Sequence, residues 1–170
     1  VKASMKAKSV YAMLAALNDQ DYDIGMILDA DNVMEKDCLE KINHAFNSGC
    51  KAMQCHRTAK NQQTAIAVLD AISEEINVNL FRRAPAVLKI SAAPIGSGMA
   101  FSFPILKEIF SQPAILNNPG EDREIDLYLM KHKIQMHFID GAVVYDEKVA
   151  NAGVFEKQRV RWLEAQINHV

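Results

Sequence analysis

The chain has 170 residues, of which 49% are hydrophobic, and a formal net charge of −2. This length suits one domain with a substantial core, because domains typically hold about 100 to 150 residues. The near balance of charge gives no electrostatic reason to expect a nucleic-acid partner or a general attraction to membrane surfaces. No apolar run in the sequence approaches the roughly 18 to 20 residues that a membrane-spanning helix needs.

The first half of the chain alternates helical and strand patterns. A helix is predicted over about 6–18, a buried strand over 22–28, a helix within 35–49 and a short strand over 51–57. A longer helix fits 63–83. Its apolar stripe consists of Ile66, Leu69, Ile72, Ile76 and Leu80. Strands that alternate with helices in this way indicate an α/β fold.

The second half begins with a segment rich in Gly, Pro, Ser and Ala. This segment, 82–104, predicts a loop that leads into a strand near 98–103. A helix over 104–110 would have Pro104 at its first position, where proline is well tolerated. The remaining predicted elements are a helix over 121–133, strands over 134–139 and 142–147, and an amphipathic helix over 154–167.

Two aspartates follow the first predicted strand, in "MILDADNV" at 26–33. Residues i and i+2 of a strand share one side, so Asp29 and Asp31 are expected to point together and to repel unless a cation or hydrogen-bond donors lie between them. Ligands of open α/β sheets gather beyond the carboxyl ends of the strands. Paired carboxylates there suit Mg²⁺ or Mn²⁺, which would neutralise a diphosphate. The alternative is that the two aspartates only cap the turn and the next helix.

Acidic residues open the helix predicted over 121–133, in "GEDREID". Negative charge is ordinarily favoured at a helix start by the helix dipole, so Glu121 and Asp122 need no function there. A functional alternative is that Asp122 is a general base, because a carboxylate at the rim of a pocket can accept the proton of an attacking hydroxyl.

The last predicted helix contains "QRVRW", in which Gln158, Arg161 and Trp162 stand at i, i+3 and i+4 and would share one helix face. An amide, a guanidinium and a flat aromatic ring together could hydrogen-bond, clamp a phosphate and stack against a sugar. The alternative is that Trp162 packs into the core while Arg161 is solvated. Gln158 would then lie on the packing side as well.

In this order and at these separations, "DAD", "ED" and "QxxRW" resemble the inverting family-2 glycosyltransferases. The likeness is to the membrane-associated branch that includes cellulose, chitin and hyaluronan synthases. The stretches "KAKSVYAMLAAL", "RTAKNQQT", "GSGMAF" and "VVYDEKV" resemble a bacterial subgroup with this architecture. The resemblance implies a nucleotide-diphospho-sugar transferase (GT-A) fold, with a mixed, mostly parallel sheet flanked by helices. It also implies displacement with inversion at the anomeric carbon of the donor sugar.

The resemblance further implies a role for individual residues. Asp29 would lie near the donor nucleotide and its diphosphate, Asp31 and Asp29 would hold Mg²⁺ or Mn²⁺, and Asp122 would be the catalytic base. For the donor, the expected contacts are Lys8 and the pyrophosphate-binding pair Gln158 and Arg161. For the acceptor, they are Trp162, Gly96, Ser97 and Gly98, where the two glycines would let the backbone approach the sugar.

The family normally begins with a βαβ segment that carries the first nucleotide-contacting aspartate, and this sequence has none. We therefore expect residues 1–170 to form the C-terminal two-thirds of a GT-A catalytic domain, from a parent anchored at the cytoplasmic face of the membrane. Expected partners are a nucleotide diphosphate sugar donor and a glycan or lipid-linked acceptor, without nucleic acid. The strand over 22–28 would keep an unpaired apolar edge, which predicts a homodimer.

Three other classes of protein remain. A sugar-phosphate nucleotidylyltransferase has a related fold and acidic metal ligands, but it attacks phosphorus and gives the "QxxRW" helix no evident task. A non-catalytic sugar-binding module could retain the fold, although an intact Asp122 argues against the loss of activity. A glycosidase is disfavoured, because its two carboxylates, about 5 to 10 Å apart, act without a diphosphate clamp.

Overall fold

The structure is a computed structural model that describes residues 6–18, 21–118 and 120–167. Within these residues, strands form one sheet in the order β1-β4-β3-β5-β2. The strands are β1 (Ile24–Ile27), β2 (Val33–Met34), β3 (Ala52–Ala59), β4 (Met99–Ser102) and β5 (Met136–Asp146). The helices are α1 (Lys6–Ala15), α2 (Cys38–Asn47), α3 (Ala65–Val78), the π-helix η2 (Asn79–Arg83), α4 (Ala84–Val87), α5 (Phe103–Ser111), α6 (Pro113–Asn117), α7 (Glu121–Lys131) and α8 (Ala152–Ile167).

The sheet is mixed. β3 and β5 are parallel neighbours, whereas β4 runs antiparallel between β1 and β3, and β2 runs antiparallel along β5. The expected α/β fold with a mixed sheet flanked by helices is confirmed. The expectation that the sheet is mostly parallel fails for neighbouring strands, because β4 enters between two strands that point the same way.

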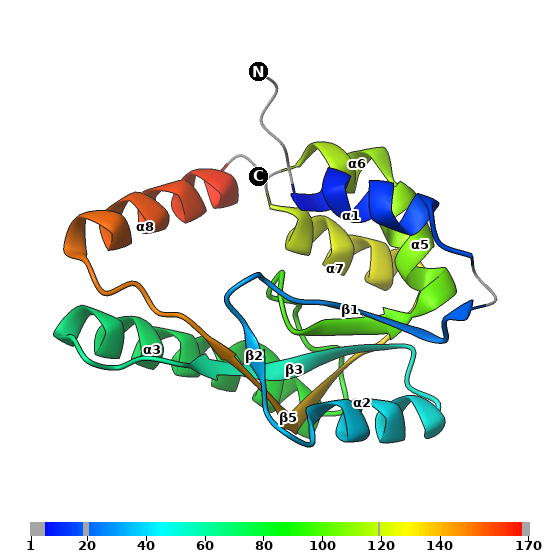
Figure 1. The fold of residues 1–170 in the computed structure, drawn as a ribbon, viewed down its shortest axis with the longest axis horizontal. Helices are drawn as coiled ribbons and strands as arrows, with labels where there is room; N and C mark the ends of the chain where they lie inside the picture. Colours follow the sequence, from blue (N-terminus) through cyan, green and yellow to red (C-terminus); the bar gives the residue numbers. More distant parts are fainter. Residues whose placement is uncertain (1–5, 19–20, 119, 168–170) are drawn as a thin grey trace.

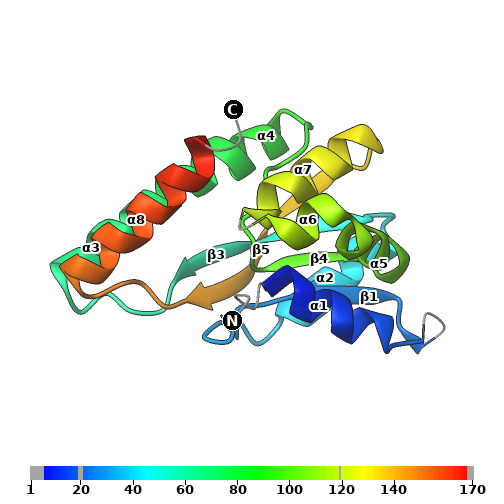
Figure 2. The same ribbon diagram turned by 90° about the horizontal axis from the view of Figure 1, so that it is seen from above.

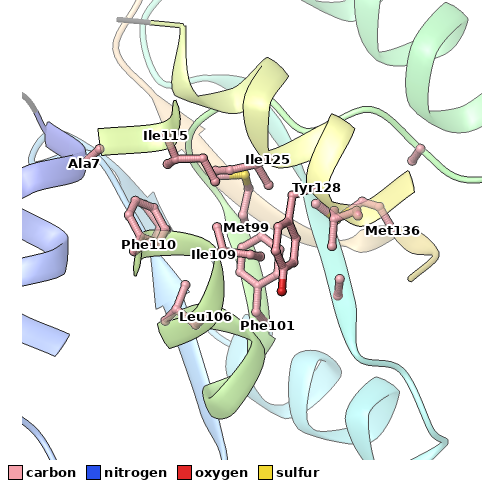
Figure 3. Packing of buried hydrophobic residues seen from close by; sticks show 14 of the residues in the cluster. Ala7, Met99, Phe101, Leu106, Ile109, Phe110, Ile115, Ile125, Tyr128 and Met136 are labelled. Atoms are coloured by element: carbon pink, nitrogen blue, oxygen red, sulfur yellow. The ribbon is translucent and has the colours of Figure 1, made fainter. Parts of the chain in front are cut away.

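Two cores cover the two faces of the sheet. The larger core lies between the sheet and helices α1, α5, α6 and α7. The smaller core lies between the opposite face of the sheet and α2 (Figures 1 and 2). Strand alternation divides the side chains, so Phe101 of β4 belongs to the larger core while its neighbour Ala100 belongs to the smaller. Phe101, Ile109, Phe110 and Ile125 interdigitate in the larger core (Figure 3). In the described part of the chain, no helix is long and apolar enough to cross a membrane.

The helix predicted over 63–83 differs from the prediction in length and in orientation. It continues through η2 into α4, so residues 84–87 are helical and not loop. The predicted apolar stripe faces outward, and its members Leu69, Ile72, Ile76 and Leu80 are each more than half exposed. The prediction was wrong because the buried face consists of Ala67, Asp70, Ala71 and Val78. Ion pairs join this helix to other elements: Asp70 meets Arg159, and Glu74 meets Arg57 and Lys148.

Three smaller differences concern the strands and one short helix. The two strands predicted over 134–139 and 142–147 form the single strand β5. A register shift beside Cys55 and His56 lets β5 accommodate extra residues and continue. β2 and α6 were not predicted, because two and five residues are too short to show a period.

Candidate functional site

Three segments that are distant in the sequence meet around the side chain of Lys6. The Lys6 Nζ lies 2.5 Å from Asp29 Oδ1 and 2.6 Å from the carbonyl oxygen of Gly96. A Cβ atom placed on Gly96 would stand 4.0 Å from the Cβ of Asp122. The structure therefore brings together the "DAD" turn, the loop over residues 93–98 before β4 and the start of α7. We refer to residues 93–98 as the glycine loop. We refer to Lys6, Asp29, Gly96 and Asp122 as the central cluster.

The two aspartates lie in a turn and not in the strand. β1 ends at Ile27, and the Asn32 amide donates to the Asp29 carbonyl oxygen at 3.1 Å. The expectation that Asp29 and Asp31 share one side of a strand is therefore wrong, because the chain turns before it reaches them. Asp29 is half-buried against Lys6, while Asp31 is exposed.

Asn32 organises this turn with both ends of its side-chain amide. Its Nδ2 donates to Asp31 Oδ1 at 3.2 Å and to Asp146 Oδ1 at 2.8 Å. Its Oδ1 accepts from the Asp29 amide at 3.3 Å and from the Ser97 hydroxyl. The turn is thus joined to the glycine loop and to the end of β5. Asn32 was not singled out in the sequence, although its place directly after "DAD" is a usable signal.

The backbone of the glycine loop adopts φ angles that residues other than glycine rarely adopt. Gly96 and Gly98 have φ angles of +73° and +68°, in the left-handed region that favours glycine. Gln54 of β3, which is fully buried, supports the loop: its Nε2 donates to the Ser97 carbonyl at 2.8 Å, and its Oε1 accepts from the Ile95 amide at 3.0 Å. The sequence interpretation missed Gln54, although an amide inside the apolar run "AMQC" is the kind of buried polar group that needs an explanation.

Acidic groups gather beside the cation of Lys6. Burial raises the pKa of Glu121, and the negative charges of Asp122 and Asp29 raise it further while Lys6 opposes them. Asp122 is half-buried, and its Oδ1 accepts from the Arg123 amide at 3.0 Å. Asp122 therefore faces the glycine loop from the first turn of α7, within reach of a group bound there.

The structure places Lys6, and not Lys8, at this site. An α-helix turns about 100° per residue, so side chains two positions apart point in very different directions. Lys8 is exposed, whereas Lys6 is half-buried against Asp29 and Gly96. The spacing "KAK" offers either lysine, and only the direction of α1 decides between them.

Helix α8 is attached elsewhere, next to α3. Arg159 Nη2 lies 2.7 Å from Asp70 Oδ1, and its guanidinium lies 4.8 Å from the Phe155 ring centre. Gln158 is half-buried, and its Oε1 is buried without a hydrogen-bond partner among the described residues. The side chains of Arg161 and Trp162 lie outside the described part. No contact with the central cluster is described for these three residues, and their roles stay predictions.

The "DAD" turn fits a divalent cation chemically. Asp29 and Asp31 offer the oxygen ligands that Mg²⁺ and Mn²⁺ prefer. Within the described residues, no group of three or more His, Cys, Asp or Glu side chains is placed to hold a metal alone. In general, Mg²⁺ is commonly bound by one or two carboxylates together with substrate phosphates and water.

Carboxylates beyond the strand ends of an α/β sheet, beside a glycine loop, are typical of enzymes that bind phosphate-containing substrates. The chain belongs to the family described as "Glycosyltransferase like family 2", whose model matches residues 2–165. Family membership gives the protein a role in glycosyl transfer and confirms the resemblance to family-2 glycosyltransferases. No curated protein matches the chain.

Proposed function

We propose that the protein transfers a hexose or N-acetylhexosamine from a nucleotide diphosphate sugar to a hydroxyl of a glycan or lipid-linked acceptor, with inversion. The observation that carries this proposal is the meeting of Asp29, Gly96 and Asp122 around Lys6. Such a site has the cation of Lys6 and the carboxylate of Asp29 for the diphosphate end of a donor. It also has a separate carboxylate for the acceptor end.

Each residue of the cluster has a distinct task in this reaction. Asp122 accepts the proton of the acceptor hydroxyl, whose oxygen attacks the anomeric carbon. The diphosphate leaves from the opposite face of the sugar, so the configuration inverts. Lys6 supplies positive charge beside the departing diphosphate, where negative charge develops. The loop around Gly96 and Gly98 lets the sugar approach the backbone closely, because no side chain intervenes.

A divalent cation and α8 complete the proposed site. Asp29 and Asp31 would hold Mg²⁺ or Mn²⁺, which supplies electrostatic stabilisation of the leaving diphosphate when bound. Gln158 and Arg161 would bind the pyrophosphate, and Trp162 would stack against the acceptor sugar. The support for these three roles is the ordered set of motifs, "DAD", "ED" and "QxxRW".

We also propose that the enzyme works at the cytoplasmic face of a membrane and associates as a dimer. The first part is supported by the motif resemblance to the membrane-associated branch. The second is supported by β1, which stands at one end of the described sheet and contains no charged residue in Ile24–Ile27. An apolar edge of this kind favours pairing with a second copy. Light scattering coupled to size exclusion tests the dimer, and a monomer at high concentration would contradict it.

The sugar-transfer proposal is tested by product analysis with a panel of nucleotide sugars and acceptors. Mass spectrometry should detect a glycosylated acceptor together with the nucleoside diphosphate. Asp122→Asn should lower kcat by about 10² to 10⁴-fold with donor affinity largely preserved, because a general base acts mainly in the transition state.

The exposed Asp37, which pairs with Lys41 on α2, is a matched control carboxylate. Asp37→Asn should leave kcat within about twofold, as expected for a surface site remote from the chemistry. A product that carries a nucleotide joined to a sugar phosphate would instead support a nucleotidylyltransferase. Equal loss of donor affinity and of kcat in Asp122→Asn would contradict the role of base.

A further inference from the structure

Arg82 and Arg83 are neighbours in sequence but occupy opposite environments. Arg82 is only 6% exposed, and its guanidinium is directed into the fold. Arg83 lies at the surface, where its Nη2 stands 2.6 Å from Asp140 Oδ1. A pair of arginines after an apolar helix is ordinarily a solvated basic patch, so the buried position of Arg82 needs a reason.

The buried guanidinium binds the beginning of the glycine loop. Arg82 Nε donates to the Ala93 carbonyl at 2.9 Å, and Nη2 donates to the Pro94 carbonyl at 3.0 Å. Its Nη1 donates to the Asn77 carbonyl at 3.2 Å, which joins α3 to the same point. A planar guanidinium can serve several acceptors at fixed angles, which a lysine ammonium cannot reproduce.

Arg82 and Gln54 together hold consecutive parts of one loop. Arg82 binds residues 93 and 94, and Gln54 binds residues 95, 97 and 98. Between them, the carbonyl of Gly96 accepts from Lys6. The backbone between β4 and the preceding segment is therefore fixed by three side chains from three different elements. Its course beside Asp122 depends on them.

The charge of Arg82 is also felt by the acids of α7. Burial lowers the pKa of Arg82 to about 10, and the negative charges of Asp122 and Asp126 partly oppose this effect. Burial raises the pKa of Asp126, and Arg82 opposes that rise. A buried cation without a carboxylate in direct contact is unfavourable for stability, so its retention calls for a gain elsewhere.

The π-helix η2 explains how one arginine of the pair is turned inward. A π-helix closes i→i+5 hydrogen bonds and so inserts extra backbone into the helical turn, a feature that is frequent at functional sites. η2 contains both Arg82 and Arg83, and α4 resumes directly after it. The Phe81 carbonyl in the same turn accepts from the Ala93 amide at 3.0 Å, which fixes η2 to the loop.

We propose that Arg82 is a positioning residue of the transfer site, which fixes the loop 93–98 and provides positive charge behind Asp122. This inference rests on the proposed role of Asp122 as base. It assigns two separable tasks to Arg82: its hydrogen bonds hold the loop in place, and its charge opposes the rise that burial gives to the pKa of Asp126 on α7.

The first test measures hydrogen exchange of the loop amides in Arg82→Gln, with Arg83→Gln as the matched control. We expect the peptide over 93–98 to exchange at least about tenfold faster in Arg82→Gln, relative to β4 amides, because the loop loses its bonds to Arg82. Arg83→Gln should leave loop exchange unchanged. Equal loop exchange in the two variants, once global stability is corrected for, would overturn the positioning role.

The second test is the pH dependence of kcat/KM with the donor and acceptor that the unsubstituted protein uses. The charged groups near Asp122 are Arg82 of η2 and its neighbours Glu121 and Asp126 on α7, while Lys6 of α1 and Asp29 after β1 lie near Glu121. Removing Arg82 takes away the cation that opposes the rise in the pKa of Asp126, so the acidic limb should move to higher pH.

Arg82→Lys separates the two tasks and replaces Arg82→Gln if that variant fails to fold. It keeps a positive charge but cannot bridge three carbonyls, so loop exchange should rise while the acidic limb stays near that of the unsubstituted protein. An acidic limb that does not move in Arg82→Gln would overturn the charge role. If no donor is used by the unsubstituted protein, the proposed function fails, and the exchange experiment still decides the role of Arg82 in the loop.

Discussion

The glycine loop before β4 and the helix α8 are both expected to contact substrate, and the fold holds them in different ways. Buried or half-buried side chains of Gln54, Arg82 and Lys6 bind the loop backbone from several directions. The contacts described for α8 include the pair of Arg159 with Asp70 and the guanidinium of Arg159 over Phe155. The position of the loop is thus set by side chains from three different elements, α1, β3 and η2. The contacts described for α8 come from fewer side chains.

The largest effect should come from removing the support of the loop. Gln54→Leu keeps the volume but leaves the half-buried Ile95 amide and the buried Ser97 carbonyl without their partner. Each unsatisfied buried group costs roughly 1 to 3 kcal/mol, so we expect the free energy of unfolding to fall by about 3 kcal/mol in chemical denaturation. Gln63→Leu at an exposed position should change it by less than about 0.5 kcal/mol. Similar losses in both variants would mean that the loop is not held by Gln54.

Gly98 and Gly49 both have positive φ, but only Gly98 is closely packed. Substituting each in turn therefore separates the cost of crowding in the loop from the cost of backbone strain. A Cβ on Gly98 would meet Gln54 Nε2 at 3.3 Å and Cys55 Cβ at 3.5 Å, while a Cβ on Gly49 would meet nothing within 4 Å. Gly98→Ala should therefore lower the free energy of unfolding by about 2 kcal/mol, and Gly49→Ala should lower it by about 1 kcal/mol. Both substitutions strain the backbone, but only Gly98→Ala also crowds its neighbours. Thermal unfolding of both variants decides this, and equal values would argue against a tightly packed loop.

The two lysines of α1 test which side chain serves the donor. Lys6→Met should weaken binding of a nucleoside diphosphate by about tenfold, because a charge-assisted contact with phosphate is lost. Lys8→Met should change the affinity by less than about twofold, because Lys8 is exposed on another part of the helix. Calorimetry with UDP and GDP is the measurement. A stronger effect at Lys8 would restore the assignment made from the sequence.

The smallest effect is expected at the attachment of α8. Asp70→Asn removes the ion pair with Arg159, in which Asp70 is 9% and Arg159 is 28% exposed. The free energy of local unfolding of α8 should fall by about 1 kcal/mol. Amide exchange over 152–167 should then be about fivefold faster while β3 is unchanged. Glu156→Gln, an exposed change on the same helix, is the control. A uniform loss of protection across the protein would show that Asp70 belongs to the core and not to a local attachment.

The sequence allowed the fold class, most elements and the family to be predicted. Strand ends could be located from the apolar run before Asp29 and from the glycines at 96 and 98, and α/β topology places such segments together. The start of α7 at Glu121 was predicted from its acidic first turn. These inferences depend on local patterns that the fold preserves.

The remaining features depend on contacts between distant segments. The outward face of α3 could not be seen, because its inner face is set by Arg57 and Lys148 from other elements. The choice of Lys6 over Lys8 depends on the direction of α1 relative to the turn. The burial of Arg82 requires a π-helix, for which the stretch "NLFRR" carries no simple signal. Pairwise patterns in sequence do not specify such placements.

The most direct test of the central claim is whether the "DAD" turn, the glycine loop and the start of α7 form one binding site for a metal and a diphosphate. Amide resonances can be followed by NMR while Mn²⁺ is added in the presence of UDP or GDP, since the paramagnetic ion broadens signals of nearby residues. We expect residues 29–32, 96–98 and 121–123 to broaden together, and we expect Asp31→Asn to abolish this pattern while Asp21→Asn preserves it. Broadening confined to another surface, or unchanged in Asp31→Asn, would contradict it.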